Sequence, residues 1–181
     1  MPMFKSTEES RIQISELMIP SHANFGGKIH GGYILSLMDR IAFACASKHS
    51  QSYCVTASVN KVNFLNPIEV GELVTMKASV NYVGKSSMVV GIRVESENIR
   101  TGKKKHCNSS YFTMVAVDES GKTVTVPGLI LSTKMDAKRF IKSIIRRESD
   151  IKRSADLDNL YKNLDQHLDK LKDYRVKIDI K

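Results

Sequence analysis

The feature that most constrains this chain is a long apolar segment followed by an abrupt change of hydrophobic period. Between Tyr33 and Lys48 apolar residues recur almost all round a helix, which is typical of a helix buried on most of its surface. From Tyr53 onward apolar residues alternate with polar ones, as in strands with one buried face. The chain must therefore pack one long helix against a sheet. The apolar helix positions are Ile34, Leu35, Leu37, Met38, Ile41, Ala42, Ala44 and Cys45.

Four runs with a period of two follow the helix. They cover residues 53–60, 74–82, 88–94 and 107–117, and the turn signals around them are Asn66-Pro67, Gly84-Lys85, Thr101-Gly102 and Ser120-Gly121. One buried helix followed by long, regularly turned strands favours an antiparallel sheet wrapped around a long central helix. We therefore predict an α+β fold.

The two ends of the chain differ from this central part. Residues 1–10 are polar and are expected to be frayed, and residues 11–19 form a short strand that Pro20 ends. Residues 132–181 contain no glycine or proline, and leucines recur there at three- and four-residue steps. This spacing predicts an amphipathic helix. We place the domain in residues 1–131 and a basic, mainly helical C-terminal extension in residues 132–181.

Composition limits the class of protein. With 41% hydrophobic and 26% charged residues, the 181-residue chain has the make-up of a globular protein with a single core. Polar groups interrupt every apolar stretch, and no basic-then-apolar leader opens the chain. We therefore expect no membrane span and a cytoplasmic location.

Cysteine, histidine and charge bear on the kind of ligand. The three cysteines lack a CxxC pair and the five histidines lack HExxH spacing, so we predict no metal and no disulfide framework. The net charge is +9, and 14 of the 28 Lys and Arg residues lie in the last fifty positions. A basic surface attracts nucleic acid, anionic lipid or a phosphorylated small molecule, and the motifs below favour the last.

Two features around the predicted helix bear chemistry. Gly31-Gly32 precedes it, so backbone N–H groups at the positive end of the helix dipole are available to an oxyanion. Asp39 lies two turns further on, in an otherwise apolar helix, where an unpaired buried carboxylate would be costly. Alternatively, Asp39 pairs with Arg40 or reaches solvent, and the glycines only allow close packing.

Several blocks in the right order resemble the acyl-CoA thioesterases of the hot-dog superfamily. The first blocks are Ile19-Pro20-Ser21-His22-Ala23-Asn24, Gly27-Lys28-Ile29-His30-Gly31-Gly32 and Leu37-Met38-Asp39. Downstream blocks are Thr56-Ala57-Ser58-Val59-Asn60, Val70-Gly71-Glu72, Tyr82-Val83-Gly84-Lys85-Ser86-Ser87 and Phe112-Thr113-Met114-Val115-Ala116-Val117-Asp118. The resemblance covers roughly residues 11–130 and does not extend into the C-terminal extension.

This resemblance implies a hot-dog fold and hydrolysis of acyl-CoA to a free carboxylic acid and coenzyme A. It assigns Asp39 as general base or nucleophile, Asn24 as the residue that positions water or thioester, and the Gly32 backbone N–H as the group that polarises the carbonyl. It also implies a homodimer that assembles to a hexamer, with active sites between subunits. A base, a positioned water and oxyanion donors are what thioester hydrolysis needs, so no cofactor is expected.

The resemblance also places coenzyme A along Gly84, Lys85, Ser86 and Ser87, which from composition alone form an ordinary hairpin turn. Three further groups of residues have at most minor roles in this interpretation. His30 is more typical of a packed histidine than of an acid or base. Cys45 and His49 have helical spacing but no orienting third residue. The lysines at 103–105 are typical of a solvated hairpin.

Two other functions remain possible from the sequence. A hot-dog dehydratase would use a buried histidine with a carboxylate, and the pairing of Asn24 with Asp39 disfavours it. A non-enzymatic acyl-CoA-binding sensor or regulatory module would use the same pocket and contact a partner through the basic tail. The tail has no helix-turn-helix pattern, so we expect no nucleic acid partner.

Overall fold

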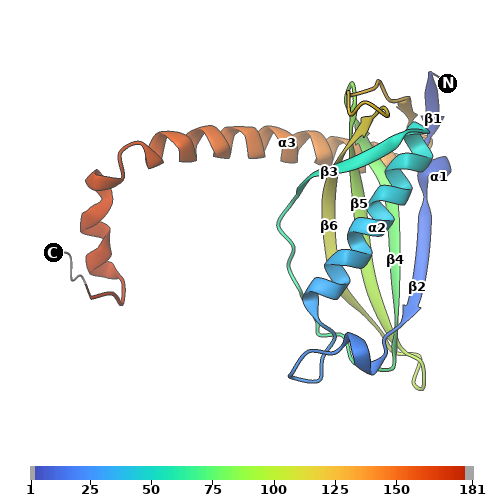
Figure 1. Ribbon diagram of the computed structural model, residues 1–181, viewed down its shortest axis with the longest axis horizontal. Helices are drawn as coiled ribbons and strands as arrows, with labels where there is room; N and C mark the ends of the chain where they lie inside the picture. The colour runs from blue at the N-terminus through green and yellow to red at the C-terminus, as the bar shows by residue number, and fades with distance from the viewer. Residues whose placement is uncertain (1–2, 178–181) are drawn as a thin grey trace. The chain divides into compact units, whose positions relative to one another are not determined.

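The computed structural model describes residues 3–177 and shows one long helix lying along a face of an antiparallel sheet (Figure 1). In chain order the elements are β1 (Phe4–Ser6), α1 (Thr7–Ser10), β2 (Ile12–Leu17), the 3-10 helix η1 (Pro20–His22), α2 (Gly31–Ser50), β3 (Tyr53–Val59), β4 (Glu72–Val83), β5 (Ser87–Asn98), β6 (Lys104–Val117), β7 (Gly128–Ile130), α3 (Lys134–Tyr161) and the 3-10 helix η2 (Leu164–Asp173). The predicted helix and strands are confirmed, with ends that shift by a few residues.

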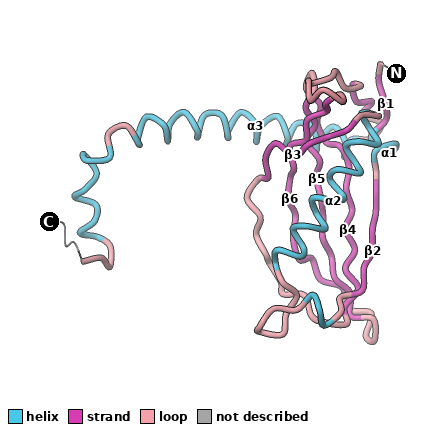
Figure 2. Tube along the Cα trace, viewed as in Figure 1, coloured by secondary structure: helices cyan, strands magenta, loops and turns pink. Residues whose placement is uncertain are grey.

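The main sheet has five strands in the order β2-β4-β5-β6-β3, and every neighbouring pair is antiparallel. Helix α2 packs against all five strands, as the tube view in Figure 2 makes easy to follow. The predicted α+β class, with a sheet built around a central helix, is therefore confirmed. Strand β3 is an edge of this sheet, and that position matters for the site.

The core lies between the inner face of the sheet and α2. Alternate positions of the central strands are buried, as a period of two requires. The buried strand residues include Val74, Met76, Ala78, Val80, Met88, Val90, Ile92, Val94, Phe112, Met114 and Ala116, and the helix adds Ile34, Leu37, Met38, Ile41, Ala42, Cys45 and Ala46. The helix ends at Ser50 because Gln51 takes a left-handed conformation with φ of 55°.

Residues 4–10 are more ordered than expected. Strand β1 pairs in parallel with β7, and the Glu9 carboxylate accepts a hydrogen bond of 2.9 Å from the Ser6 N–H at the start of α1. Lys5 is buried, and its Nζ donates to the His49 carbonyl at 2.8 Å. A cation near the last carbonyls of a helix satisfies groups that would otherwise lack partners. The expectation of a frayed segment was therefore wrong from Phe4 onward.

The contacts divide the chain into residues 1–143 and residues 144–181. The first ten residues of α3 thus belong with the sheet, and the division at residue 131 stays a prediction. The second unit holds the rest of α3 and η2, with exposed leucines at 157, 160, 164 and 168. A helix is confirmed in α3, but of the leucines that predicted it only Leu157 and Leu160 lie in α3, and the others lie in the 3-10 helix η2.

Candidate active site

An apolar groove of about 560 Å³ runs along α2 where the helix faces the end of β3. Helix α2 contributes Gly32, Leu35, Ser36 and Asp39, and the opposite wall and floor come from Val59, Asn60, Val62 and Phe112. The helix residues lie three or four positions apart, so they share one face. The groove therefore brings together two of the three predicted catalytic residues, Gly32 and Asp39.

Asp39 is exposed at the edge of this groove rather than buried in the helix packing. Its Oδ1 accepts a hydrogen bond of 2.6 Å from Thr56 Oγ1 on β3. Of the alternatives that the sequence leaves open, Asp39 reaches solvent within the single subunit, and its hydrogen-bond partner is Thr56. In the sequence Thr56 is only part of a family block, because its place beside Asp39 requires the packing of β3 on α2.

The start of α2 explains why both positions before Tyr33 are glycine. A Cβ on Gly31 would lie 3.3 Å from the Phe64 ring, and a Cβ on Gly32 would lie 3.0 Å from the His30 ring. His30 is the N-cap residue, and its Nδ1 accepts a hydrogen bond of 2.9 Å from the Gly32 N–H. The predicted oxyanion donor is thus present beside the groove, and it is bonded to the imidazole.

Asn24 lies in an exposed loop outside the groove. Its Oδ1 accepts hydrogen bonds from the backbone N–H groups of Gly26, at 2.9 Å, and Lys28, at 3.2 Å. These two bonds form a local turn that fixes the amide oxygen. No hydrogen bond joins Asn24 to Asp39 within the subunit.

The predicted coenzyme A segment lies at the other end of the sheet. The β4–β5 turn is closed by a hydrogen bond of 2.7 Å from the Gly84 N–H to the Ser87 carbonyl. The Lys85 carbonyl accepts from Val126, next to Pro127, and Pro127 contacts His49 at the end of α2. Figure 1 shows the same arrangement, since the β4–β5 turn and the start of α2 lie at opposite ends of the sheet. Gly84, Lys85, Ser86 and Ser87 are therefore not brought to Gly32 within one subunit.

The two remaining nucleophile candidates are structural. Burial raises the pKa of Cys45 to about 12, and its Sγ donates to the Ser10 carbonyl at 3.1 Å. The buried His49 ring instead bonds the Pro127 carbonyl at 2.9 Å. These two side chains are turned to different backbone carbonyls, so they do not form a nucleophile and base pair.

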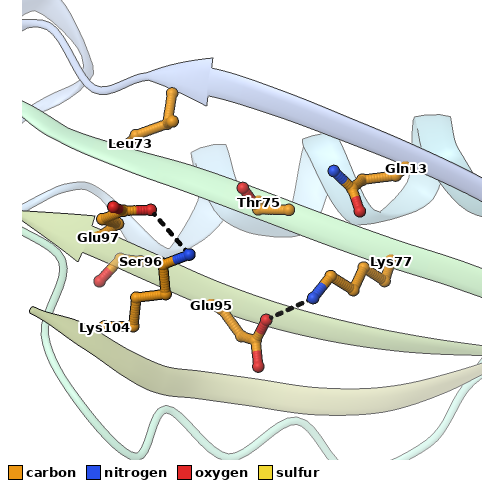
Figure 3. A pocket seen from close by; sticks show the side chains of 8 residues that line it. All are labelled: Gln13, Leu73, Thr75, Lys77, Glu95, Ser96, Glu97 and Lys104. Carbon is orange, nitrogen blue, oxygen red and sulfur yellow. Dashed lines mark hydrogen bonds and ion pairs between the residues drawn. The ribbon is translucent and has the colours of Figure 1, made fainter. Parts of the chain in front are cut away.

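A smaller hollow of about 130 Å³ lies over β2, β4, β5 and β6 (Figure 3). Its charges neutralise one another, with Lys77 Nζ 2.9 Å from Glu95 Oε2 and Lys104 Nζ 3.2 Å from Glu97 Oε2 (Figure 3). Hydrogen bonds from Lys77 and Arg93 lower the pKa of Glu95 to about 2. A carboxylate held this firmly in its ionised form is suited to structure rather than proton transfer.

Residues 3–177 contain neither a cluster of metal-ligating side chains nor a membrane-spanning helix. Within this range no group of three or more His, Cys, Asp or Glu side chains is placed to hold a metal ion. Among the same residues, no helix is both long and apolar enough to cross a membrane.

The thioesterase superfamily profile matches residues 26–103. Protein VdlD of Helicobacter pylori is 41% identical over 143 residues, which is 79% of this chain and 82% of that protein. The acyl-CoA thioester hydrolase YkhA of Bacillus subtilis, described as uncharacterized, is 34% identical over 133 residues, or 74% and 77% of the two chains.

Solved structures extend these relationships to the fold. An apo-hexameric acyl-CoA thioesterase superposes with a TM-score of 0.82 at 37% identity, covering 84% of this chain and 98% of that chain. The Staphylococcus aureus acyl-CoA hydrolase in complex with butyryl coenzyme A, coenzyme A and coenzyme A disulfide gives 0.79 at 30% identity, covering 89% and 98%.

Variants of the Staphylococcus aureus enzyme were also solved with an aspartate, an asparagine or a threonine replaced by alanine. In that chain the asparagine precedes the aspartate by 15 residues and the threonine follows it by 17, the same spacing as Asn24, Asp39 and Thr56. Fold, sequence and groove agree: this chain belongs to the thioesterase superfamily and is an acyl-CoA thioester hydrolase with the hot-dog fold.

Proposed function

We propose that this hydrolase cleaves acyl-CoA with Asp39 as general base or nucleophile, oriented by Thr56, while Asn24 positions water or thioester and the Gly32 N–H polarises the carbonyl. The observation that carries the proposal is the 2.6 Å hydrogen bond that holds Asp39 at the edge of an apolar groove also lined by Gly32. The apolar walls, formed by Leu35, Val59 and other side chains, suit an acyl chain.

In the general-base route, Asp39 removes a proton from water as the water oxygen attacks the thioester carbonyl carbon. The developing oxyanion accepts a hydrogen bond from the Gly32 N–H, which favours the transition state. The carbon–sulfur bond then breaks, and the proton passes from Asp39 to the coenzyme A thiolate. In the nucleophilic route, the Asp39 carboxylate attacks the carbonyl carbon, the carbon–sulfur bond breaks and coenzyme A leaves as a thiolate. Water then cleaves the resulting anhydride, which releases the carboxylic acid, regenerates the Asp39 carboxylate and supplies the proton that the thiolate takes up.

The equal spacing of the asparagine, aspartate and threonine in the Staphylococcus aureus enzyme supports the same three positions here. Those residues were chosen for replacement in a relative that is 30% identical and whose structure holds coenzyme A. We therefore assign Thr56 to the site together with Asn24 and Asp39.

We also propose that the site is completed by a second subunit, in a homodimer that assembles to a hexamer. Strand β3 has a free edge, and its residues Tyr53, Val55 and Val59 are exposed at 63%, 41% and 45%. An exposed apolar edge strand is a ready site for pairing with another chain. Within one subunit Asp39 lies apart from both Asn24 and the β4–β5 turn, and a second subunit can supply them. The hexameric relative supports this assembly.

The coenzyme A segment is proposed at Gly84, Lys85, Ser86 and Ser87, where the exposed Lys85 can meet a phosphate of the nucleotide. We further propose a cytoplasmic location, and we expect no nucleic acid partner. A rat relative named as a cytosolic acyl coenzyme A thioester hydrolase is 31% identical over 133 residues, although the match spans only 35% of that protein.

Thiol release from a panel of acyl-CoAs of increasing chain length tests this function. Asp39→Ala and Asn24→Ala should each lower kcat by roughly 10²–10⁴, the usual worth of a positioned base or orienting group. Glu119→Ala, which removes an exposed carboxylate far along the chain, serves as the control and should keep wild-type kcat. Activity of Asp39→Ala within a few-fold of wild type would refute the assignment.

A further inference from the structure

The oxyanion donor assigned above is already engaged by its own chain. The Gly32 N–H donates to His30 Nδ1 at 2.9 Å, and the imidazole lies so close that a Cβ on Gly32 would sit 3.0 Å from both Nδ1 and Cε1. A backbone amide carries a single proton, so it cannot bond fully to both an imidazole and a thioester carbonyl. One acceptor has to leave before the other binds.

The chemistry of this contact defines the state of the ring. Nδ1 accepts a hydrogen bond, so it carries no proton, and the neutral ring has its proton on Nε2. Within the described residues the ring makes no other hydrogen bond, and His30 is exposed. The imidazole can therefore rotate away into solvent at the cost of one hydrogen bond, without moving the groove walls.

We propose that His30 is a reversible cap on the Gly32 amide, which the thioester carbonyl displaces as substrate binds. This inference rests on the proposed role of Gly32. The cap satisfies an otherwise unpaired N–H at the start of α2 in the free enzyme. The cap also lowers the affinity for a carbonyl ligand, because the carbonyl has to replace the imidazole, whereas a ligand without a carbonyl leaves the cap in place. His30 acts only through Gly32 and is a positioning residue.

Two non-hydrolysable ligands separate this role from a merely structural one. In the ketone analogue of acyl-CoA, a methylene replaces the sulfur and the carbonyl is retained. In the thioether analogue, an alkyl chain on the coenzyme A sulfur has no carbonyl. The ketone must displace the cap, whereas the thioether does not. Calorimetry gives the dissociation constants of both analogues. Their ratio measures the cost of displacing His30 from Gly32 and does not depend on hydrolysis.

The test compares wild type with His30→Phe and His30→Asn. Phenylalanine keeps a ring but has no hydrogen-bond acceptor, so the Gly32 N–H is free for the ketone. The ketone should therefore bind about three- to tenfold more tightly, which is the usual net contribution of one hydrogen bond in water. Thioether binding should stay within about twofold of wild type. Asparagine keeps an N-cap acceptor and should restore the wild-type ratio of the two constants. If His30 only stabilised the start of α2, His30→Phe would weaken the binding of both analogues by the same factor.

Equal changes for both analogues in His30→Phe, or no change for either, would overturn the proposal. If that variant fails to fold, the wild-type structure with the ketone bound decides the question. The proposal expects the His30 ring to have left Gly32, and an intact contact beside a bound carbonyl contradicts it. This test is independent of the test of the proposed function, because it measures the binding of two analogues, whereas the proposed function is tested by the turnover of Asp39→Ala and Asn24→Ala.

Discussion

At the scale of single residues, the Thr56 hydroxyl determines how the Asp39 carboxylate is presented to the groove. Asp39 is exposed, so burial does not hold it in place, and the 2.6 Å bond from Thr56 Oγ1 is its only hydrogen bond among the described residues. A hydrogen bond to a charged group is worth more than one between neutral groups. The orientation of the Asp39 carboxylate, our proposed base, therefore depends on a residue seventeen positions further along the chain.

We predict that Thr56→Val, which keeps the side-chain shape and removes the hydroxyl, lowers kcat by roughly tenfold to a hundredfold, as expected for loss of a hydrogen bond to a charged group. Thr56→Ser retains the hydroxyl and should recover most of the activity. Thiol release under saturating acyl-CoA measures both. Wild-type kcat in Thr56→Val, or an equal loss in Thr56→Ser, would contradict a role in orienting Asp39.

His49 is a second residue whose environment has a measurable consequence. It is fully buried, and burial lowers the pKa of its imidazole from the ordinary 6.5, with the nearby Lys5 ammonium acting in the same direction. Nε2 donates to the Pro127 carbonyl, so Nδ1 is the site that would take a proton, and no hydrogen-bond partner for it lies among the described residues. Protonation would place an unpaired charge in the core.

The folded state therefore binds fewer protons at His49 than the unfolded chain does. Its contribution to stability is complete above pH 6.5 and is lost progressively as the pH falls from 6.5 to the lower pKa of the folded state. We predict that the melting temperature of wild type falls more steeply between about pH 7 and pH 5.5, where an ordinary histidine titrates, than that of His49→Gln. Glutamine keeps an N–H donor and does not titrate. If the melting temperatures of wild type and His49→Gln changed in parallel with pH, His49 would not couple stability to pH.

At the scale of secondary-structure elements, the opening turns of α3 are part of the sheet unit. The buried Asp136 carboxylate accepts hydrogen bonds from Arg11 at 3.2 Å and from Thr133 Oγ1 at 2.6 Å. The Phe140 ring lies 5.2 Å from Tyr82 on β4, and Ser143 is buried. Beyond Ser143, the large apolar side chains Ile145, Ile151 and Leu164 are exposed.

Two truncations test which part of the extension stabilises the sheet unit. Deleting residues 144–181 should leave the melting temperature of the sheet unit nearly unchanged, whereas deleting residues 132–181 should lower it by roughly 5–10 °C, equivalent to about 2–3 kcal/mol in a chain of this size. Both should keep thioesterase activity per folded subunit, because the extension holds no catalytic constellation. A truncation at residue 143 that folds and assembles but is inactive would contradict this view.

At the scale of the whole molecule, one subunit does not bring all of the proposed site residues to the groove. The groove holds Asp39 and Gly32, while Asn24 lies in a separate loop and the β4–β5 turn lies at the far end of the sheet. Pairing around a two-fold axis brings the same surface of two subunits together, so each subunit can supply what the other lacks. Oligomerisation would then be a requirement for catalysis.

Mixed oligomers test this requirement. If Asn24 and Asp39 meet across a subunit boundary, co-expression of Asn24→Ala and Asp39→Ala chains with different affinity tags should recover about one quarter of wild-type activity, because half of randomly paired dimers are hybrids with one intact site each. Each variant alone supplies the inactive baseline. Purified hybrid oligomers that stay at this baseline would place both residues in the same subunit.

Much of the fold is encoded in local patterns. The helical apolar run and the runs with a period of two determine α2 and the central strands, because side-chain direction repeats every 3.6 residues in a helix and every two in a strand. Gly31-Gly32 and Asp39 could be singled out for the same reason, since glycines before a helix and a carboxylate within it are unusual locally. The order of the blocks then predicted the family.

Only the tertiary structure decided how these residues meet. The exposure of Asp39 and its bond to Thr56 depend on how β3 packs on α2, and the pairing of elements distant in sequence is not set by any local period. The ordered start of the chain likewise depends on Lys5 reaching the end of α2, forty-four residues away. The contact of His30 with Gly32 spans only two residues, yet it depends on the extended conformation that His30 takes as the N-cap of α2. The sequence determines which side chains each helix or strand carries on each of its faces, and tertiary packing determines which residues those side chains contact.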